Sequence, residues 1–214
     1  HYSHYLPLPP VQPPDTYRYF VLNKPFHMVS QFVSVEDVPL LSHLDFKFPP
    51  GTHTIGRLDA LSEGLLLLST NKKVIDLLFK SARPHRRTYL VRVLRTVTAE
   101  TVQQLQQGVT IRVRSKGDHL TAPCEVELLT EPPAVFRHQL ETNPHIAHSW
   151  LRVSLYEGKY HQIRNMMRAV NHPCRRLIRT SIEDLELGEL PPGAVRELTE
   201  TDFFRLLKIG AWDR

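Results

Sequence analysis

The residues best suited to chemistry lie in one segment, IGRLDALSEGLLLLSTN, at residues 55–71. Arg57 and Asp59 point the same way if this part of the chain is extended, and Gly56 permits a tight backbone before them. Residues 64–69 are short and apolar enough to form a core strand. An acid held at the lip of a hydrophobic sheet can act as a nucleophile. The pair can instead be an ion pair that braces a loop, which is the commoner role of an isolated Arg/Asp pair.

A second group of candidates lies on a predicted helix over residues 159–171. Four apolar residues recur at helical spacing and define a core face: Ile163, Met166, Met167 and Val170. Three cationic residues follow the same spacing on another face: His161, Arg164 and Arg168. A charged helix face is usually only solvated. It can also present a cation to a site, and the spacing alone leaves both interpretations open.

A third candidate is Tyr89, which begins a predicted strand directly after a basic string. The string contains Arg83, His85, Arg86 and Arg87. In the simplest interpretation Tyr89 is a core or rim aromatic of a sheet. Its ring could also stack against a nucleic-acid base, and its hydroxyl could accept a proton.

Composition limits the class of protein. The chain has 214 residues, 41% of them hydrophobic, which is enough for one generous domain or two small lobes with a real core. A formal charge of +5 favours a polyanionic partner. Cys124 and Cys174 are far apart and have no metal-ligand spacing, so the sequence predicts neither a disulfide framework nor a zinc site, and a reducing cytoplasm fits best. No apolar run approaches the roughly 18 residues of a membrane span.

The order of predicted elements indicates an α+β protein with a mixed, mostly antiparallel sheet flanked by helices. Strands are predicted at residues 19–22, 64–69, 89–94, 109–113, 124–129 and 150–156. Helical segments are predicted at residues 40–44 and 72–80, from the Thr98 cap to Gly108, and at 159–171. No regular βαβ alternation is present.

The first 17 residues form a separate region. They contain five prolines and no hydrophobic period, which predicts a disordered arm or a tag remnant rather than a folded element. Residues 18–214 are expected to form a single catalytic domain. Because His1 is not an initiator methionine, further residues are expected upstream, and a targeting segment or an extra domain could be among them.

Three stretches resemble the pseudouridine synthases of the RsuA/RluE family. GRLDALSEGLLLLSTN is similar to the family signature, RRTYLVRV carries a tyrosine at the family's position, and EGKYHQIRNMMRAVNHPCRRLIR carries the motif arginine. Asn23, Lys24 and Pro25 also resemble the family's opening strand and turn. The resemblance extends from about Arg18 to about Thr201. It implies a pseudouridine synthase fold.

The implied reaction is an isomerisation of uridine to pseudouridine in ribosomal RNA. The uracil is detached from the ribose, rotates in the pocket and rejoins through its C5 carbon. The target base would be flipped out of its helix or loop, at an unstacking cost of a few kcal/mol. No metal or organic cofactor is implied, and no metal-ligand cluster or phosphate-binding glycine loop is evident. The missing RNA-binding domain and the NKPFHMVSQF opening most resemble the branch that acts on one uridine of large-subunit ribosomal RNA.

The resemblance assigns roles to nine residues. Three are catalytic: Asp59 as nucleophile, Tyr89 beneath the uracil, and Arg164 as the cation that pairs with Asp59. Six bind the uridine or the RNA: Lys24, Arg57, Arg87, His161, Arg168 and Leu177. Arg57 would fill the gap left by the flipped base. Leu177 would pack near the base, although its position also fits plain core. The protein is expected to be cytoplasmic. It is also expected to be a monomer, since neither heptads nor an obvious apolar patch occurs.

The chain departs from the family pattern at three positions. Arg87 replaces a lysine, Asn171 replaces a glycine, and Glu183 replaces a second glycine. Asparagine tolerates a left-handed backbone, whereas Glu183 would be strained there.

Two rival functions are a catalytically silent factor for ribosomal RNA binding or ribosome assembly, and a glycosidase with Asp59 and Glu63 as paired carboxylates. The glycosidase requires a helical segment and a catalytic Glu63. Because the leucine run favours a strand instead, we expect Glu63→Gln to retain most activity.

Overall fold

A computed structural model describes residues 16–80, 83–131 and 145–210. The proline-rich arm lies outside the described residues, apart from its last two positions. The elements, in chain order, are β1 (Tyr19–Lys24), η1 (Leu41–His43), β2 (His53–Ile55), β3 (Glu63–Ser69), α1 (Lys73–Phe79), β4 (Arg87–Leu94), α2 (Ala99–Gln107), β5 (Thr110–Val113), β6 (Gly117–Leu120), β7 (Glu125–Leu129), β8 (His148–Leu155), α3 (Gln162–Ala169), β9 (Cys174–Ile182), β10 (Leu185–Glu186), β11 (Val195–Leu198) and α4 (Glu200–Leu206).

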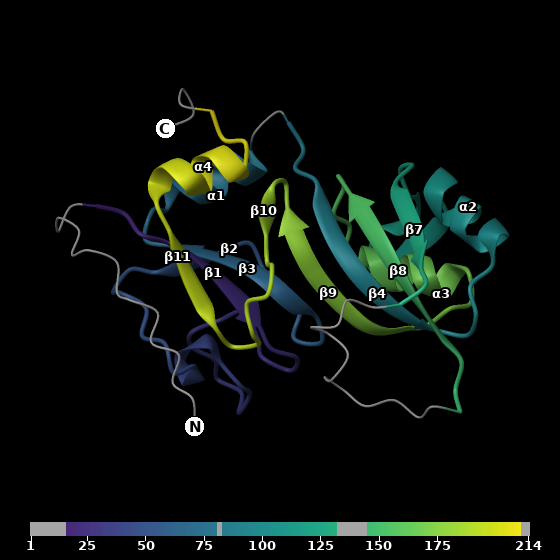
Figure 1. Ribbon diagram of the computed structural model, residues 1–214, viewed down its shortest axis with the longest axis horizontal. Coiled ribbons are helices and arrows are strands. Elements are labelled where there is room, and N and C mark those ends of the chain that lie inside the picture. Colours follow the sequence, from purple (N-terminus) through teal and green to yellow (C-terminus); the bar gives the residue numbers. More distant parts are fainter. Residues whose placement is uncertain (1–15, 81–82, 132–144, 211–214) are drawn as a thin grey trace.

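One large sheet runs through the molecule in the order β11-β1-β3-β9-β4-β8-β7, with β2 added to β3 and β10 to β9 (Figure 1). All of its pairs are antiparallel except β3 with β9. Helices α1 and α4 lie over the β1–β3 half, whereas α2 and α3 lie beside the β4–β8 half. This arrangement confirms the predicted α+β class and the mixed, mostly antiparallel sheet.

Strands β1 and β3 are buried on both faces because each face of this half of the sheet is covered. Every residue of both strands is buried, which explains the unbroken leucine run. One face packs against α1 and α4 through Tyr19, Leu65 and Leu67. The other face, with Phe20 and Leu66, packs against the loop that follows β1. At roughly 25 cal/mol per Å² of apolar surface, this double burial is the main local source of stability.

The two halves of the sheet meet at the short parallel contact between β3 and β9. Glu63 lies opposite Ile178 and Gly64 opposite Arg179. Gly64 has φ +102, and a Cβ atom there would lie 2.3 Å from the backbone oxygen of Arg179, so only glycine fits. Beside this contact the Arg176 guanidinium donates to both Glu63 oxygens at 2.8 and 3.0 Å. The pair is almost fully buried, with side chains 2% and 7% exposed.

Most predicted elements are confirmed within one or two residues, including the Thr98 cap, whose hydroxyl accepts a hydrogen bond from Thr101 N. The predicted helix over residues 159–171 is too long, because α3 covers only Gln162–Ala169. His161 at its start and Asn171 beyond its end have φ values of 50° and 64°, which a helix cannot continue through. The core face is confirmed: Ile163, Met166 and Met167 are buried and Val170 packs against them.

Among the described residues, no helix is both long and apolar enough to cross a membrane.

The buried Glu63–Arg176 pair yields a stability prediction. Glu63→Gln leaves the Arg176 charge without its buried counter-charge, and breaking such a pair typically costs about 3 kcal/mol or more. We therefore expect the free energy of unfolding, measured by urea titration, to fall by about that amount. Glu127→Gln is the matched control: Glu127 forms an exposed pair with Arg152, and its loss should cost less than about 1 kcal/mol. Equal effects of the two changes would contradict this account of the β3–β9 contact.

Candidate active site

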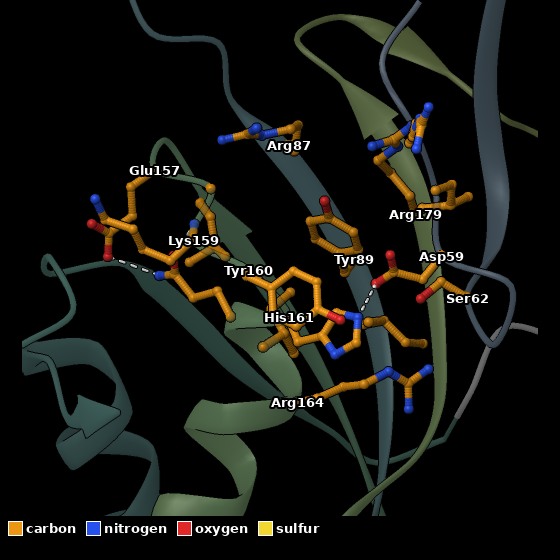
Figure 2. Close-up of a pocket in the computed structure, with 17 residues that line it drawn as sticks. Asp59, Ser62, Arg87, Tyr89, Glu157, Lys159, Tyr160, His161, Arg164 and Arg179 are labelled. Carbon is orange, nitrogen blue, oxygen red and sulfur yellow. Dashed lines mark hydrogen bonds and ion pairs between the residues drawn. The ribbon is translucent and has the colours of Figure 1, made fainter. Parts of the chain in front are cut away.

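A cavity of about 230 Å³ opens where the loop after β2, the strands β4 and β9, and the loop before α3 come together. Figure 2 shows side chains from all four segments pointing into it. Seven of the nine sequence-predicted site residues line it: Arg57, Asp59, Arg87, Tyr89, His161, Arg164 and Leu177. The fold thus gathers residues that are more than 100 positions apart in the chain.

Asp59 lies on a loop that is fixed from several sides. Ser62 N donates to the Asp59 backbone oxygen at 2.9 Å, and His27 N donates to Ala60 O at 2.7 Å. The Ser30 hydroxyl accepts from Leu58 N at 3.1 Å. The Asp59 side chain itself is 48% exposed. The backbone of this loop is therefore held firmly while its carboxylate faces the open cavity.

The carboxylate of Asp59 is paired with His161. Nε2 of His161 lies 3.2 Å from Oδ2 of Asp59 (Figure 2). The imidazole stacks on Tyr160, with ring centroids 3.8 Å apart and an interplanar angle of 15°. His161 has the left-handed backbone conformation immediately before α3. It is therefore not part of the cationic helix face that the sequence predicted, but its side chain pairs with the candidate nucleophile.

The predicted pairing of Arg164 with Asp59 is wrong for this structure. Nη2 of Arg164 donates to the backbone oxygen of Leu61 at 2.9 Å. Arg164 still lines the cavity, on the side opposite Arg87 in Figure 2. It thus ties α3 to the loop that carries Asp59. The resemblance predicted the right neighbourhood but the wrong partner, because a motif match does not determine which atom the guanidinium of a long side chain reaches.

The loop before α3 is held by Glu157. Its carboxylate accepts hydrogen bonds from Ala122 N and from Gln162 Nε2, both at 2.8 Å, and Nε2 of His119 lies 3.1 Å away. Burial alone would raise the pKa of Glu157, but these donors together lower it. Gln162 also accepts a hydrogen bond from Lys159 N at 2.9 Å. An ionised Glu157 thus helps to fix the turn that places His161 over the cavity.

Tyr89 lies in the middle of β4, opposite Val153 on β8 and Arg179 on β9. It is half-buried, and its ring faces the same cavity as Asp59 (Figure 2). Leu177 lines the floor of the cavity and is 7% exposed. An aromatic ring, an aliphatic side chain and an exposed carboxylate therefore line the same cavity.

Two arginines border the cavity on its sheet side. Arg87 donates from Nη2 to Tyr156 O at 3.0 Å, and burial lowers its pKa from the usual value. Arg179 is 7% exposed and donates from Nε to Leu65 O at 2.8 Å. Sequence analysis missed Arg179, as it missed Ser62, Glu157, Lys159 and Tyr160. Arg179 had a signal, since alternation along a strand places it on the same face as Leu177.

Lys24 does not reach the site as predicted. Its side chain is fully buried, and its ammonium donates to Met28 O at 2.6 Å, Pro25 O at 2.8 Å and Ala60 O at 3.4 Å. A fully buried ammonium cannot contact RNA, so the structure corrects that expectation. Burial lowers its pKa to about 8, although Glu63 and Asp59 oppose the shift. Lys24 instead braces the backbone on either side of the site.

Arg168 and Glu63 lie outside the cavity, and the predicted contact of Arg168 with RNA phosphates stays a prediction. Arg168 is exposed on α3 and does not line the cavity. Glu63 belongs to strand β3 and is held by Arg176, so it is not available as the second carboxylate of a glycosidase. Among the described residues, no group of three or more His, Cys, Asp or Glu side chains could hold a metal ion.

Comparison with known proteins places the chain in a family. The model of the RNA pseudouridylate synthase family matches residues 18–169. The chain therefore belongs to this family. It is a pseudouridine synthase, an isomerase.

Individual relatives agree with this assignment. The chain is 32% identical over 174 residues to ribosomal large subunit pseudouridine synthase E of Xanthomonas axonopodis pv. citri (strain 306), a match that covers 80% of this chain and 89% of that protein. It is 29% identical to the dual-specificity RNA pseudouridine synthase RluF of Escherichia coli (strain K12), covering 88% of this chain and 57% of that protein. A crystal structure of a pseudouridylate synthase superposes with a TM-score of 0.71 at 27% identity, over 89% of this chain and 74% of that one.

The buried position of Lys24 predicts how its replacement acts. Lys24→Met leaves buried carbonyl oxygens without a donor, which should lower the free energy of unfolding by about 1–3 kcal/mol at pH 7. Because the folded pKa is about 8 and the unfolded value is about 10.4, the unfolded state binds more protons between these values. Wild-type stability should therefore rise relative to the variant as pH increases from about 8 to 10.5, by up to about 3 kcal/mol.

Urea titrations of both proteins at pH 7, 8, 9 and 10 measure this difference. RNA affinity provides a second readout, since loss of a phosphate contact lowers the slope of log K against log salt by about 1. We expect no change of that slope in Lys24→Met. A stability difference that is independent of pH, or a reduced salt slope, would contradict the bracing role.

Proposed function

We propose that this pseudouridine synthase isomerises a specific uridine of ribosomal RNA, with Asp59 as the nucleophile and the target base flipped into the cavity. The observation that carries the proposal is the position of Asp59. An exposed carboxylate on a rigid loop faces a cavity that also holds the ring of Tyr89 and is bordered by arginines. The other carboxylate that lines the cavity, Glu157, is occupied by its hydrogen bonds.

The reaction breaks the bond between N1 of uracil and the anomeric carbon of the ribose, and forms a bond between that carbon and C5. N1 takes up a proton and C5 releases one, so the product is an isomer of the substrate. The ionised Asp59 starts this sequence by attack on the anomeric carbon, by attack on C6 of the ring, or by removal of a ribose proton. Two of these routes need the carboxylate to face the ribose of the flipped nucleotide, and attack on C6 needs it to face the adjacent edge of the base.

The proposed roles of the neighbouring residues follow from their positions. Tyr89 stacks against the detached uracil and accepts the C5 proton through its hydroxyl. Leu177 supports the other side of the base. Arg57 is exposed beside Asp59 and takes the place of the flipped base in its helix or loop. Arg164 holds the Asp59 loop through Leu61.

The substrate and the extent of the catalytic unit are also proposals. The Xanthomonas relative is named for the large ribosomal subunit, and we propose the same target here. A single-stranded loop or bulge is the favoured shape, because bases there are cheapest to extrude. We further propose that residues 18–214 form one catalytic domain and that it acts without a metal or an organic cofactor.

The role of Asp59 predicts the outcome of its isosteric replacement. Asp59→Asn removes the charge and the nucleophile but keeps the size of the side chain. We expect tritium release from ribosomal RNA labelled at uridine C5 to fall by more than about a thousandfold, as expected when a nucleophile is lost. RNA affinity should stay within about twofold.

Asp37→Asn is the control, since Asp37 is an exposed aspartate outside the cavity; it should retain full activity. Tritium release by Asp59→Asn at the wild-type rate would refute the proposed nucleophile.

His161 allows a second test, because its imidazole is either a positioning group for Asp59 or a contact for RNA phosphate. His161→Asn removes the ring and keeps a residue that tolerates a left-handed backbone. If the imidazole positions Asp59, kcat should fall about tenfold while KM and the salt dependence of RNA binding stay unchanged. A raised KM with unchanged kcat would assign His161 to the RNA phosphates instead.

A further inference from the structure

A second cleft opens beside the candidate active site. It has a volume of about 490 Å³ and lies between the end of α1, the segment before β4 and the residues after β8. Arg57, Arg87, Gly158 and Arg179 line both this cleft and the catalytic cavity. The two hollows therefore lie side by side and share a wall.

The cleft is cationic. Four arginines line it: Arg57, Arg83, Arg87 and Arg179. None of its lining residues is an aspartate or a glutamate. Nε of Arg87 is buried without a hydrogen-bond partner in the described part of the chain. A cleft lined by one sign of charge concentrates the opposite charge, which favours a polyanionic ligand.

Two aromatic rings in the cleft are open to solvent. Phe79, at the end of α1, is 57% exposed, and Tyr156, just after β8, is 52% exposed. Among the described residues Tyr17 and Tyr160 are exposed to a similar degree, whereas Tyr19, Phe20, Phe203 and Phe204 are buried in the core clusters. An exposed aromatic surface beside arginines is the combination that single-stranded nucleic acid recognises, because the rings stack on bases and the cations follow the phosphates.

Two glycines allow the backbone to approach side chains in the walls of the cleft closely. Gly56 has φ +74, and a Cβ atom there would lie 2.9 Å from Cζ of Phe79. The ring of Phe79 therefore rests on the backbone next to Arg57. A Cβ atom at Gly158 would lie 3.0 Å from Nη1 of Arg87. The backbone thus approaches both the ring and the guanidinium closely, which holds them at the border between the two hollows.

We propose that this cleft is a binding subsite for a nucleotide adjacent to the target uridine in the RNA strand. Its base stacks on Phe79, and the phosphate that links it to the target lies against Arg87 at the shared wall. The subsite would let the enzyme hold the strand while the target base occupies the catalytic cavity. That the nucleotide in the catalytic cavity is a uridine under modification rests on the proposed function. Binding of the RNA strand in the cleft does not.

The test compares oligonucleotides of different length on the full chain. Affinity for fluorescent pentauridylate is measured by anisotropy, and uridine monophosphate is measured as its competitor. Phe79→Leu keeps apolar bulk but removes the aromatic face, and should weaken pentauridylate binding about tenfold, as expected for the loss of one stacked base. Affinity for the monophosphate should not change. Phe79→Trp, which restores an aromatic face, should bind pentauridylate as tightly as the wild type.

Tyr17→Leu is the matched control, because Tyr17 is also an exposed aromatic (47%) but does not line the cleft; it should leave both affinities unchanged. Unchanged pentauridylate binding in Phe79→Leu would overturn the proposal, as would equal weakening for both ligands. Displacement of pentauridylate by an acidic peptide whose own affinity depends on Phe79 would also overturn it.

Tritium release separates this test from the proposed function. A wild type that binds pentauridylate through Phe79 but releases no tritium would leave the subsite standing and refute the activity.

Discussion

The short parallel contact between β3 and β9 is the constraint on which the site depends. It joins a half-sheet that is buried on both faces to a second half that carries Tyr89 and α3. Gly64 permits the close approach, and the buried Glu63–Arg176 pair fixes its register. Because the Asp59 loop enters β3 directly and Arg179 follows Arg176 on β9, a shift at this contact would separate the nucleophile from the cavity wall.

The cations around the site have distinct physical tasks. Lys24 and Arg176 are buried and satisfy backbone or carboxylate oxygens, so their charge holds the framework together. Arg164 ties α3 to the Asp59 loop. Arg57 is exposed and has room to reach a ligand. A basic composition is therefore a poor guide to RNA affinity, because part of the positive charge is already paired with oxygen atoms inside the protein.

The strands and helices that the sequence predicted are confirmed because their hydrophobic periods are strong, whereas β9, β11 and α4 were not predicted. The family motifs likewise located Asp59, Tyr89 and Arg164 near one another. The errors concern single side chains. Lys24 follows an apolar strand, and nothing in the sequence indicates that three carbonyls enclose it. Arg164 and His161 belong to the same motif. His161 has a left-handed backbone just before α3, and it is His161 that pairs with Asp59.

Backbone strain near the site supports this account of His161. Glu183, a non-glycine residue with φ 50°, is compensated by Arg86: Glu183 N donates to Arg86 O at 2.7 Å, and Arg86 N donates to Glu183 Oε1 at 3.0 Å. His161 has the same φ but no hydrogen bond from its side chain to the helix it precedes. Its compensation comes from Tyr160 and Asp59 instead. A strained residue whose stabilising contacts are a stacked ring and the candidate nucleophile is better explained by function than by the stability of the helix.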